Sequence, residues 1–546
     1  MPSFEPSAIW KELLYDPKYP LLFNNGFFVF FFALFMLLFY VFRNKTNTRR
    51  YIFCFFSLYF FYKASGSFVG LVILSAIVDF ILSNAIYRQT NALNKKLLLL
   101  GSIVFNLGML FCFKYTNFFI SIYNDFSSGH IHPLNVLLPV GISFYTFENL
   151  SYTIDIYRGQ FEPARKFSDY LLFLSFFPKL VMGPIVRAHD FVPQINQPYT
   201  VKESDFSKGF YLIISGLFKK LIISDYITLN FVDYVFDDPA RYTGLENLFA
   251  VYGYAAVIYC DFSGYSDVAI GIAKWLGFSI PTNFLSPYQS KNITEFWRRW
   301  HISLSSWLKD YLYIPLGGNK KAGFGTFLFA GLFLFGVAAG CKNLLHLSWL
   351  LSIIISFGTL LLFLIPALVY RENKSIFTGF NLLTTMLLGG FWHGASWNFI
   401  IWGALHGVAL AIHKIWLLLT KKLPDSIQQA GWMKAIAIFI TFHFVCFCWI
   451  FFKAANFTAA TAMIQQIVGD FDWSVWGAFA KNYKSVLWMI AIAAVIHALP
   501  DNLADKLLQR FHKIPLLAYL GAFFVFLLVY GVFKSSEQVL PIYLKF

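Results

Sequence analysis

The stretch Met386–Gly407 reads M-L-L-G-G-F-W-H-G-A-S-W-N-F-I-I-W-G-A-L-H-G and places a histidine, His393, inside an apolar run. Trp392 and Trp397 flank this histidine, together with three nearby glycines: Gly389, Gly390 and Gly394. Glycines let backbones approach closely or let a helix open around a cavity. An ionisable group at membrane depth costs free energy, so its default interpretation is functional. A structural histidine bonded to a neighbouring helix is the alternative, and this stretch alone favours neither.

The composition around this stretch is that of a membrane protein. The chain has 546 residues, of which 58% are hydrophobic and 13% are charged, whereas soluble proteins carry roughly 25% charged residues. The net charge is +15, and such an excess usually marks cytoplasmic loops of membrane proteins. No basic tail or RNA-binding motif is present, so we expect no nucleic-acid partner. The expected fold class is an all-α polytopic membrane protein.

Apolar runs of roughly 17–25 residues predict about a dozen membrane-spanning helices. The run Leu382–Ile412, which contains His393, is expected to form one of them. The runs Tyr51–Tyr62 and Phe68–Ile86 predict a hairpin, which would bring the basic loops at either end of it to the same, cytoplasmic side. No polar segment is long enough for a separate soluble domain, so we expect residues 1–546 to form a single integral membrane domain.

A second informative stretch is Asn292–Asn319, in which apolar and basic residues alternate at helical pitch. This pattern predicts an amphipathic helix at the membrane interface, ended by Pro315 and Gly317–Gly318. His301 lies about 100° from the apolar stripe of this helix, where its side chain is expected to face a polar cavity. A plain interfacial anchor is the alternative. The apolar stripe comprises Phe296, Trp300, Leu304, Trp307 and Tyr311.

Two carboxylates, Asp261 and Asp267, interrupt another apolar run. They are expected to pair with Arg298 or Arg299, or to orient a histidine, and a structural ion pair is the favoured interpretation. Motifs of several enzyme classes are missing: the G-x-S-x-G elbow, H-E-x-x-H, the P-loop and the dinucleotide fingerprint. His393 and His406 lie 13 positions apart, about 140° apart on one continuous helix, which makes a poor metal pair. We expect no metal site.

The two stretches resemble the membrane-bound O-acyltransferase (MBOAT) family, and within it the bacterial alginate O-acetyltransferase branch. The resemblance rests on E-F-W-R-R-W-H-I-S-L-S-S-W-L-K-D-Y-L-Y-I-P-L-G-G-N (295–319) and G-G-F-W-H-G-A-S-W (389–397). Four further motifs follow the same branch: L-P-V-G-I-S-F-Y-T-F-E, D-F-S-G-Y-S-D, M-G-P and the terminal P-I-Y-L-K-F. The resemblance implies the MBOAT fold, with about a dozen transmembrane helices plus re-entrant and interfacial helices around a central tunnel. Residues 320–380 depart from the branch, and we expect them to form an inserted apolar hairpin.

The resemblance also implies roles for individual residues. His393 matches the family's catalytic histidine, and His301 matches the second characteristic histidine of the bacterial branch. A histidine near neutral pKa can take a proton from an attacking hydroxyl, and fixed dipoles can stabilise the oxyanion. The candidate donors to that oxyanion are Asn292, Ser305 and Trp397. Basic residues expected to attract the phosphates of an acyl-CoA are Arg298, Arg299 and Lys309, and Asp261 and Asp267 are expected to line the tunnel.

The function implied is O-acetyl transfer from a cytoplasmic donor, acetyl-CoA, across the bacterial inner membrane to an extracytoplasmic polysaccharide, either an alginate-like exopolysaccharide or peptidoglycan. The resemblance also suggests a partner, an SGNH-hydrolase-like acetyltransferase anchored outside. One alternative keeps the fold but transfers D-alanine from a carrier protein to teichoic acid. Another, from a different class, is a proton-coupled transporter or flippase, against which the lack of internal repeats counts.

Overall fold

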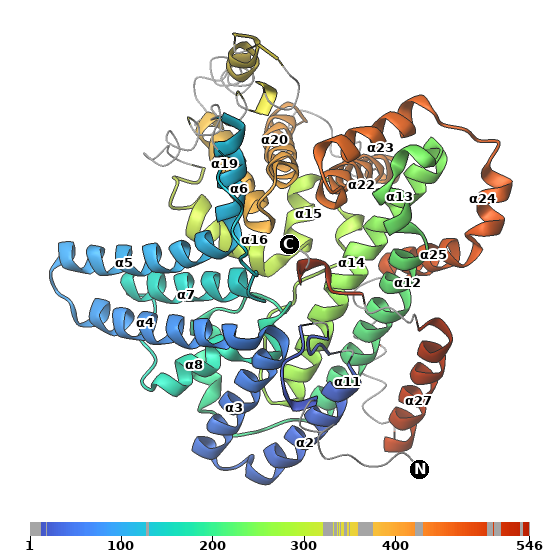
Figure 1. The fold of residues 1–546 in the computed structure, drawn as a ribbon. Coiled ribbons are helices and arrows are strands. Elements are labelled where there is room, and N and C mark those ends of the chain that lie inside the picture. Colours follow the sequence, from blue (N-terminus) through green and yellow to red (C-terminus); the bar gives the residue numbers. More distant parts are fainter. Residues whose placement is uncertain are drawn as a thin grey trace. The chain divides into compact units, whose positions relative to one another are not determined.

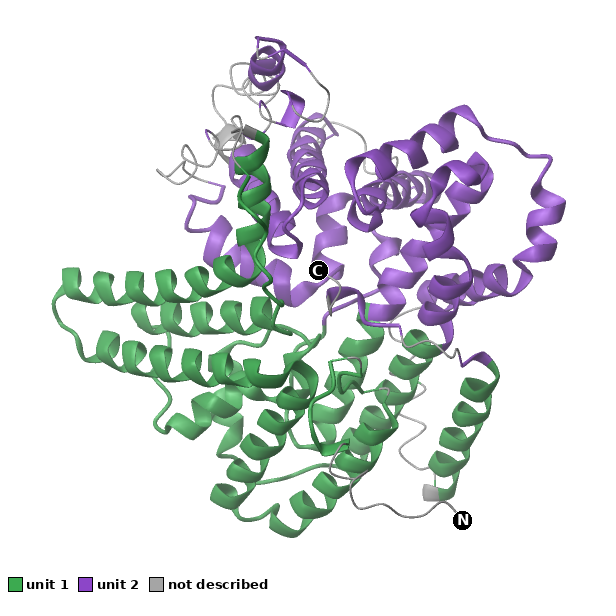
Figure 2. Cartoon of the chain, in the orientation of Figure 1, with its two compact units in different colours: residues 1–221, 262–282, 504–532 green, residues 222–261, 283–503, 533–546 purple. Residues whose placement is uncertain are grey.

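Helices make up every regular element of the part of the chain that the computed structural model describes (Figure 1). Described are residues 12–126, 130–319, 347–358, 375–420, 430–499, 515–534 and 539–544, except 18, 24 and 349, with isolated positions in 331–342 and residue 506. The chain divides into two compact units (Figure 2). Each unit combines segments that are far apart in the sequence. The single domain expected from the sequence stays a prediction.

Unit 1 comprises residues 1–221, 262–282 and 504–532. Within it α4, α5 and α7 lie side by side (Figure 1). A buried polar cluster joins these three helices, because Asp79 accepts hydrogen bonds from Ser102 at 2.5 Å and from Asn106 at 2.7 Å, and Asn149 donates to Asn106 at 3.0 Å. The helices of unit 1 are α2 (Gly26–Phe42), α3 (Thr46–Ser65), α4 (Val69–Arg88), α5 (Ala92–Leu110), α6 (Thr116–Phe126), α7 (Ile142–Tyr157), α8 (Phe167–Ser175), α9 (Phe177–Leu180), α10 (Ala188–Ile195), α11 (Glu203–Leu217) and most of α27 (Leu516–Phe533).

Unit 2 comprises residues 222–261, 283–503 and 533–546, and it contains both motif histidines. The long helix α14 (Gly244–Trp275) contributes its first part, up to Asp261, to this unit. The other helices of unit 2 are α12 (Asp225–Ile227), α13 (Asp233–Asp237), α15 (Ile293–Arg299), α16 (Ile302–Leu308), α19 (Ser375–His393), α20 (Trp397–Thr420), α22 (Gly431–Lys453), α23 (Phe457–Gly469), α24 (Trp476–Asn482) and α25 (Lys484–Ala498), with the short turn η8 (Ile542–Leu544) near the C-terminus.

Four helical runs among the described residues are long and apolar enough to cross a membrane: Thr46–Arg88, Ala92–Asp125, Trp397–Thr420 and Gly431–Lys453. The bent pair α24 and α25, which meet at 83°, raises the number to five. The dozen predicted from apolar runs is therefore not confirmed. Several predicted runs are broken into short helices, as where Pro178 lies at the start of α9 and separates it from α8.

The hairpin predicted for residues 51–86 is not formed. Helices α3 and α4 meet instead at a short 3-10 turn, Gly66–Phe68, where Gly66 has φ of +62° and ends α3. Both helices pack against α8 more than against each other, so they do not form the packed hairpin. The insert predicted at 320–380 lies mostly outside the described residues.

Candidate active site

His393 is the last residue of α19, at the tip of a helical hairpin. The sequence predicted one span across Leu382–Ile412, but the structure ends α19 at His393 and begins α20 at Trp397. The two helices pack closely (Figure 1) because glycines face each other: a Cβ on Gly403 would lie 2.4 Å from the Met386 carbonyl oxygen, and one on Gly390 would lie 2.2 Å from that of Phe399. The glycine-rich motif thus holds the histidine at the turn between two touching backbones.

Substitution of Gly403 with alanine is expected to destabilise the protein by about 1–3 kcal/mol, because a backbone carbonyl cannot move aside for the new methyl group. The control is Gly101→Ala in α5, where nothing lies within 4 Å of the added Cβ. This change should raise stability by up to about 1 kcal/mol, through helix propensity. Thermal unfolding of the detergent-purified proteins measures both. Equal unfolding temperatures for the two variants would contradict the close packing of α19 on α20.

His301 lies at a break in the helix that the sequence predicted to be continuous. The predicted helix divides into α15 and α16, and His301 between them has φ of +44°, in the left-handed region. A non-glycine residue pays for this conformation in strain, and such residues cluster at functional sites. The apolar stripe is not at an interface but inside unit 2, since Phe296, Trp300 and Leu304 are all buried.

The break fixes the tautomer of His301. The imidazole caps α16, because Nδ1 accepts a hydrogen bond from the Leu304 N–H at 3.3 Å. The side chain is fully buried at 0% exposure, and burial lowers its pKa from 6.5 to about 3, since the charged form is desolvated. His301 lies outside the candidate membrane-spanning helices of the described chain. Because its pKa is this low, the imidazole is neutral near pH 7. A neutral ring whose Nδ1 accepts carries its proton on Nε2, which is then a hydrogen-bond donor.

Two aromatic side chains each lie close to both histidines. The Trp392 ring centroid lies 6.3 Å from that of His301 and 4.9 Å from that of His393. The Tyr543 centroid lies 6.1 Å from that of His301 and 5.5 Å from that of His393. His393 is 3% exposed, and Trp402 and Phe452 complete its aromatic surroundings at 5.0 Å and 5.2 Å. The structure thus brings the two predicted histidines to one buried aromatic site within unit 2.

The other predicted residues of the two motifs have local partners or are at least partly exposed. Asn292 caps α15 by accepting from the Glu295 N–H at 2.8 Å, and Ser305 donates to the Trp300 carbonyl at 3.2 Å. Trp397 begins α20 and is partly exposed. Arg299 pairs with Glu295 at 2.9 Å. The side chains of Arg298 and Lys309 are exposed, so these two remain available to a charged ligand.

The two carboxylates of α14 have separate partners. Asp267 belongs to unit 1, where it forms an ion pair with Lys219. Asp261 belongs to unit 2 and accepts a hydrogen bond at 2.9 Å from the backbone N–H of Ile542, near the C-terminus. The sequence predicted that both would pair with Arg298 or Arg299 or would orient a histidine, with a structural ion pair favoured. Asp267 does form an ion pair, but its partner is Lys219. Arg298 and Arg299 lie on α15, and periodicity along one segment carries no information about which distant segment it meets.

Sequence reasoning missed Tyr543, Trp402 and Phe452 as neighbours of His393. Tyr543 lies 150 positions beyond His393 and was noted only as part of the terminal P-I-Y-L-K-F motif. That motif is the sequence signal that could have pointed to Tyr543. No group of three or more His, Cys, Asp or Glu side chains among the described residues could hold a metal ion.

Comparison with known proteins identifies the family. The sequence model of the MBOAT, membrane-bound O-acyltransferase family matches residues 58–374. A peptidoglycan O-acetyltransferase of Helicobacter pylori is 34% identical over 76% of this chain and 72% of its own length. A probable alginate O-acetylase of Azotobacter vinelandii is 35% identical over 87% of this chain and 82% of its own.

A third relative, a teichoic acid D-alanyltransferase of Bacillus subtilis, is 28% identical over 72% of this chain and 92% of its own length. All three relatives are named for acyl transfer to a cell-envelope or secreted polymer. The motifs, the paired buried histidines and these similarities lead to one assignment: the chain is an acyltransferase that belongs to the membrane-bound O-acyltransferase family.

Proposed function

We propose that the protein transfers acetyl groups from acetyl-CoA, supplied from the cytoplasm, toward O-acetylation of an extracytoplasmic polysaccharide, and that it resides in the bacterial cytoplasmic membrane. The observation that carries the proposal is the buried site in which Trp392 and Tyr543 each lie close to both His301 and His393. Relatives named for O-acetylation are 34–39% identical to this chain, whereas those named for D-alanyl transfer are 25–28% identical.

In this proposal His393 acts as the general base. An acceptor hydroxyl attacks the thioester carbonyl, and His393 takes the proton of that hydroxyl. The carbon–oxygen bond forms, the carbon–sulfur bond breaks, and the proton passes to the leaving thiolate, which departs as the thiol of CoA. No metal is needed for the balance of this step, since each proton and electron pair has a named destination.

His301 has the complementary role of a hydrogen-bond donor. Its Nδ1 is occupied by the Leu304 N–H, so its Nε2–H is the group that can face negative charge developing on the carbonyl oxygen. A donor held in a water-poor site stabilises such an oxyanion more strongly than water does, because it needs no reorganisation during the reaction. The strained backbone at His301 is consistent with a ring held in one orientation for this purpose.

The donor and acceptor meet this site by different routes in the proposal. Arg298 and Lys309, both exposed, would attract the phosphates of acetyl-CoA by long-range electrostatics. Asn292, Ser305 and Trp397 remain candidates for lining the acyl path. The acceptor is either an alginate-like exopolysaccharide or peptidoglycan, and an SGNH-hydrolase-like partner outside the membrane would complete transfer to a long polymer.

Deleting the protein should remove acetyl esters from one class of polymer and leave D-alanine esters unchanged. The measurement is the O-acetyl and D-alanyl content of purified envelope and secreted glycans, from cells with and without the protein. Re-expression of the native chain should restore the missing esters. Loss of D-alanine esters with normal acetylation would instead favour the teichoic acid alternative, which rests on the 28% identical relative. A lipid-linked precursor that accumulates while all esters persist would favour a flippase.

A further inference from the structure

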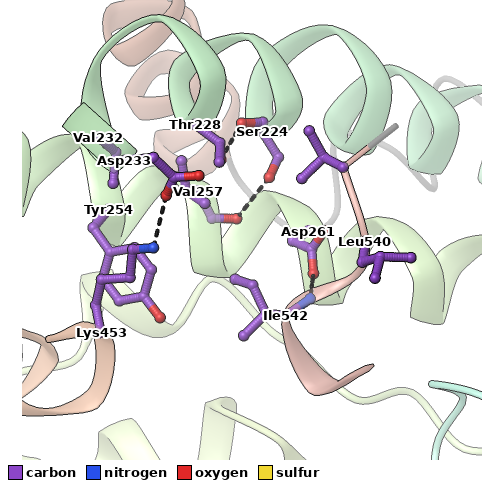
Figure 3. A pocket seen from close by; sticks show the side chains of 11 residues that line it. Ser224, Thr228, Val232, Asp233, Tyr254, Val257, Asp261, Lys453, Leu540 and Ile542 are labelled. Atoms are coloured by element: carbon purple, nitrogen blue, oxygen red, sulfur yellow. Dashed lines mark hydrogen bonds and ion pairs between the residues drawn. The ribbon is translucent and has the colours of Figure 1, made fainter. Parts of the chain in front are cut away.

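The last described residues of the chain, 539–544, form part of the candidate active site. They enter unit 2 beside α14 and end in the short turn η8. The backbone N–H of Ile542 donates to the Oδ2 atom of Asp261 at 2.9 Å (Figure 3). Asp261 is 1% exposed and Ile542 is 8% exposed. A buried carboxylate therefore holds the chain end at one defined backbone atom.

The residue directly after this hydrogen bond is the one that touches both histidines. Tyr543 follows Ile542, and its ring packs against His301 and His393. Consecutive Cα atoms are about 3.8 Å apart and the peptide between them is planar, so a fixed Ile542 N–H leaves the Tyr543 backbone little freedom. The hydrogen bond at Asp261 therefore restrains where the Tyr543 ring can lie beside the two histidines.

A small pocket with a volume of about 70 Å³ lies beside this segment and is lined by Val539, Leu540 and Ile542 together with residues of the neighbouring helices (Figure 3). Its other polar walls bond among themselves: Asp233 pairs with Lys453 at 2.7 Å, and Ser224 and Thr228 donate to helix backbone carbonyls at 3.2 Å and 2.8 Å. Leu540, at the rim of the pocket, is 36% exposed. Asp261 thus binds the segment at the edge of this pocket.

We propose that Asp261 is a positioning residue, which acts through the C-terminal segment 539–544 to hold Tyr543 beside His301 and His393. Asp261 does not touch the reacting atoms in this arrangement. Its role is to keep the segment in place, so that the Tyr543 ring stays in contact with both imidazoles. This inference rests on the proposed acetyl transfer for its effect on rate, but the seating of the segment is a physical property that can be measured without activity.

Amide hydrogen exchange of the full-length protein in detergent tests the seating directly. The Ile542 N–H should exchange at least about 10-fold faster in Asp261→Ala than in the native chain, because it loses its buried acceptor. Asp261→Asn, whose side-chain oxygen can still accept, should restore most of the protection. Peptides from α19 and α20 should exchange as in the native protein. Unchanged protection of Ile542 in Asp261→Ala would overturn the anchor.

Acetyl transfer from labelled acetyl-CoA tests the consequence. Asp261→Ala and Ile542→Pro, which remove the acceptor and the donor of the same bond, should each lower kcat by at least about 10-fold with KM for acetyl-CoA unchanged. The proline change lies at the first residue of η8, a helical position that tolerates proline. The double variant should be no slower than the slower single variant, because both changes break one contact.

Three outcomes separate the two proposals. Effects of Asp261→Ala and Ile542→Pro that multiply in the double variant would overturn their coupling. Loss of exchange protection without loss of transfer would overturn the positioning role while leaving the proposed function intact. Absence of transfer by the native protein itself would overturn the proposed function, and the exchange experiment would still decide whether Asp261 seats the chain end.

Discussion

Replacing His393 with glutamine is expected to reduce acetyl transfer by about 10²- to 10⁴-fold, the usual contribution of a positioned general base. The imidazole is buried at the tip of the α19–α20 hairpin, surrounded by the rings of Trp392, Trp402 and Phe452. Glutamine keeps a polar side chain of similar length but cannot accept a proton near neutral pH. The loss should therefore appear in kcat, because the acetyl-CoA contacts proposed for Arg298 and Lys309 are unchanged.

The control for this variant is His413→Gln, on the same helical hairpin. His413 lies on α20, where Nδ1 is hydrogen-bonded to the Thr294 hydroxyl at 2.8 Å. It has no ring contact with Tyr543 or Trp392 among the described residues, so its loss should leave transfer unchanged. Both variants should accumulate in the membrane at native abundance. Normal transfer by His393→Gln at native abundance would refute the general-base assignment.

Replacing His301 with asparagine is the second change with a large expected effect. Removal of one preorganised oxyanion donor costs about 10²- to 10³-fold in kcat, and we expect a loss of that size. Asparagine suits this position structurally, because it tolerates the left-handed backbone and is among the best helix N-caps. The variant should thus keep α15 and α16 in place while it loses the Nε2–H donor.

Thermal unfolding and membrane abundance separate these effects. An asparagine variant that unfolds like the native protein but transfers slowly assigns His301 to the reaction. Normal transfer by this variant would mean that His301 serves only the backbone turn and the helix cap. His301→Ala provides the comparison, since alanine is poor both as a cap and in the left-handed region. It should lose stability as well as activity.

Much of the architecture could be predicted from local sequence. An apolar, charge-poor chain predicts a helical membrane protein, and the family assignment followed from motifs quoted by residue number. The glycines beside His393 were expected to allow close backbone approach, and Gly390 and Gly403 do so. These features depend on composition and on contacts close to the motif, which is why the sequence was sufficient for them.

The number of spans was not predictable in the same way. An apolar run does not reveal whether a proline, a glycine or a polar residue will break it, or which helices will pack on each other. Helices α3 and α4 turn at Gly66 without packing as the expected hairpin, while 382–412 forms a hairpin where one helix was expected. Hydropathy is averaged over a window of residues. Such an average does not detect the single turn that decides whether an apolar run forms one helix or two.

The sequence alone determined the protein's class and its family, and it singled out the two histidines of the proposed site. Tertiary structure alone decided that His301 breaks its helix in a left-handed conformation, that Tyr543 reaches both imidazoles, and that Asp261 binds the chain end. The physical reason is separation along the chain. Ile542 and Asp261 are 281 positions apart, and a contact over that distance depends on how the intervening helices pack, which no local pattern of side chains records.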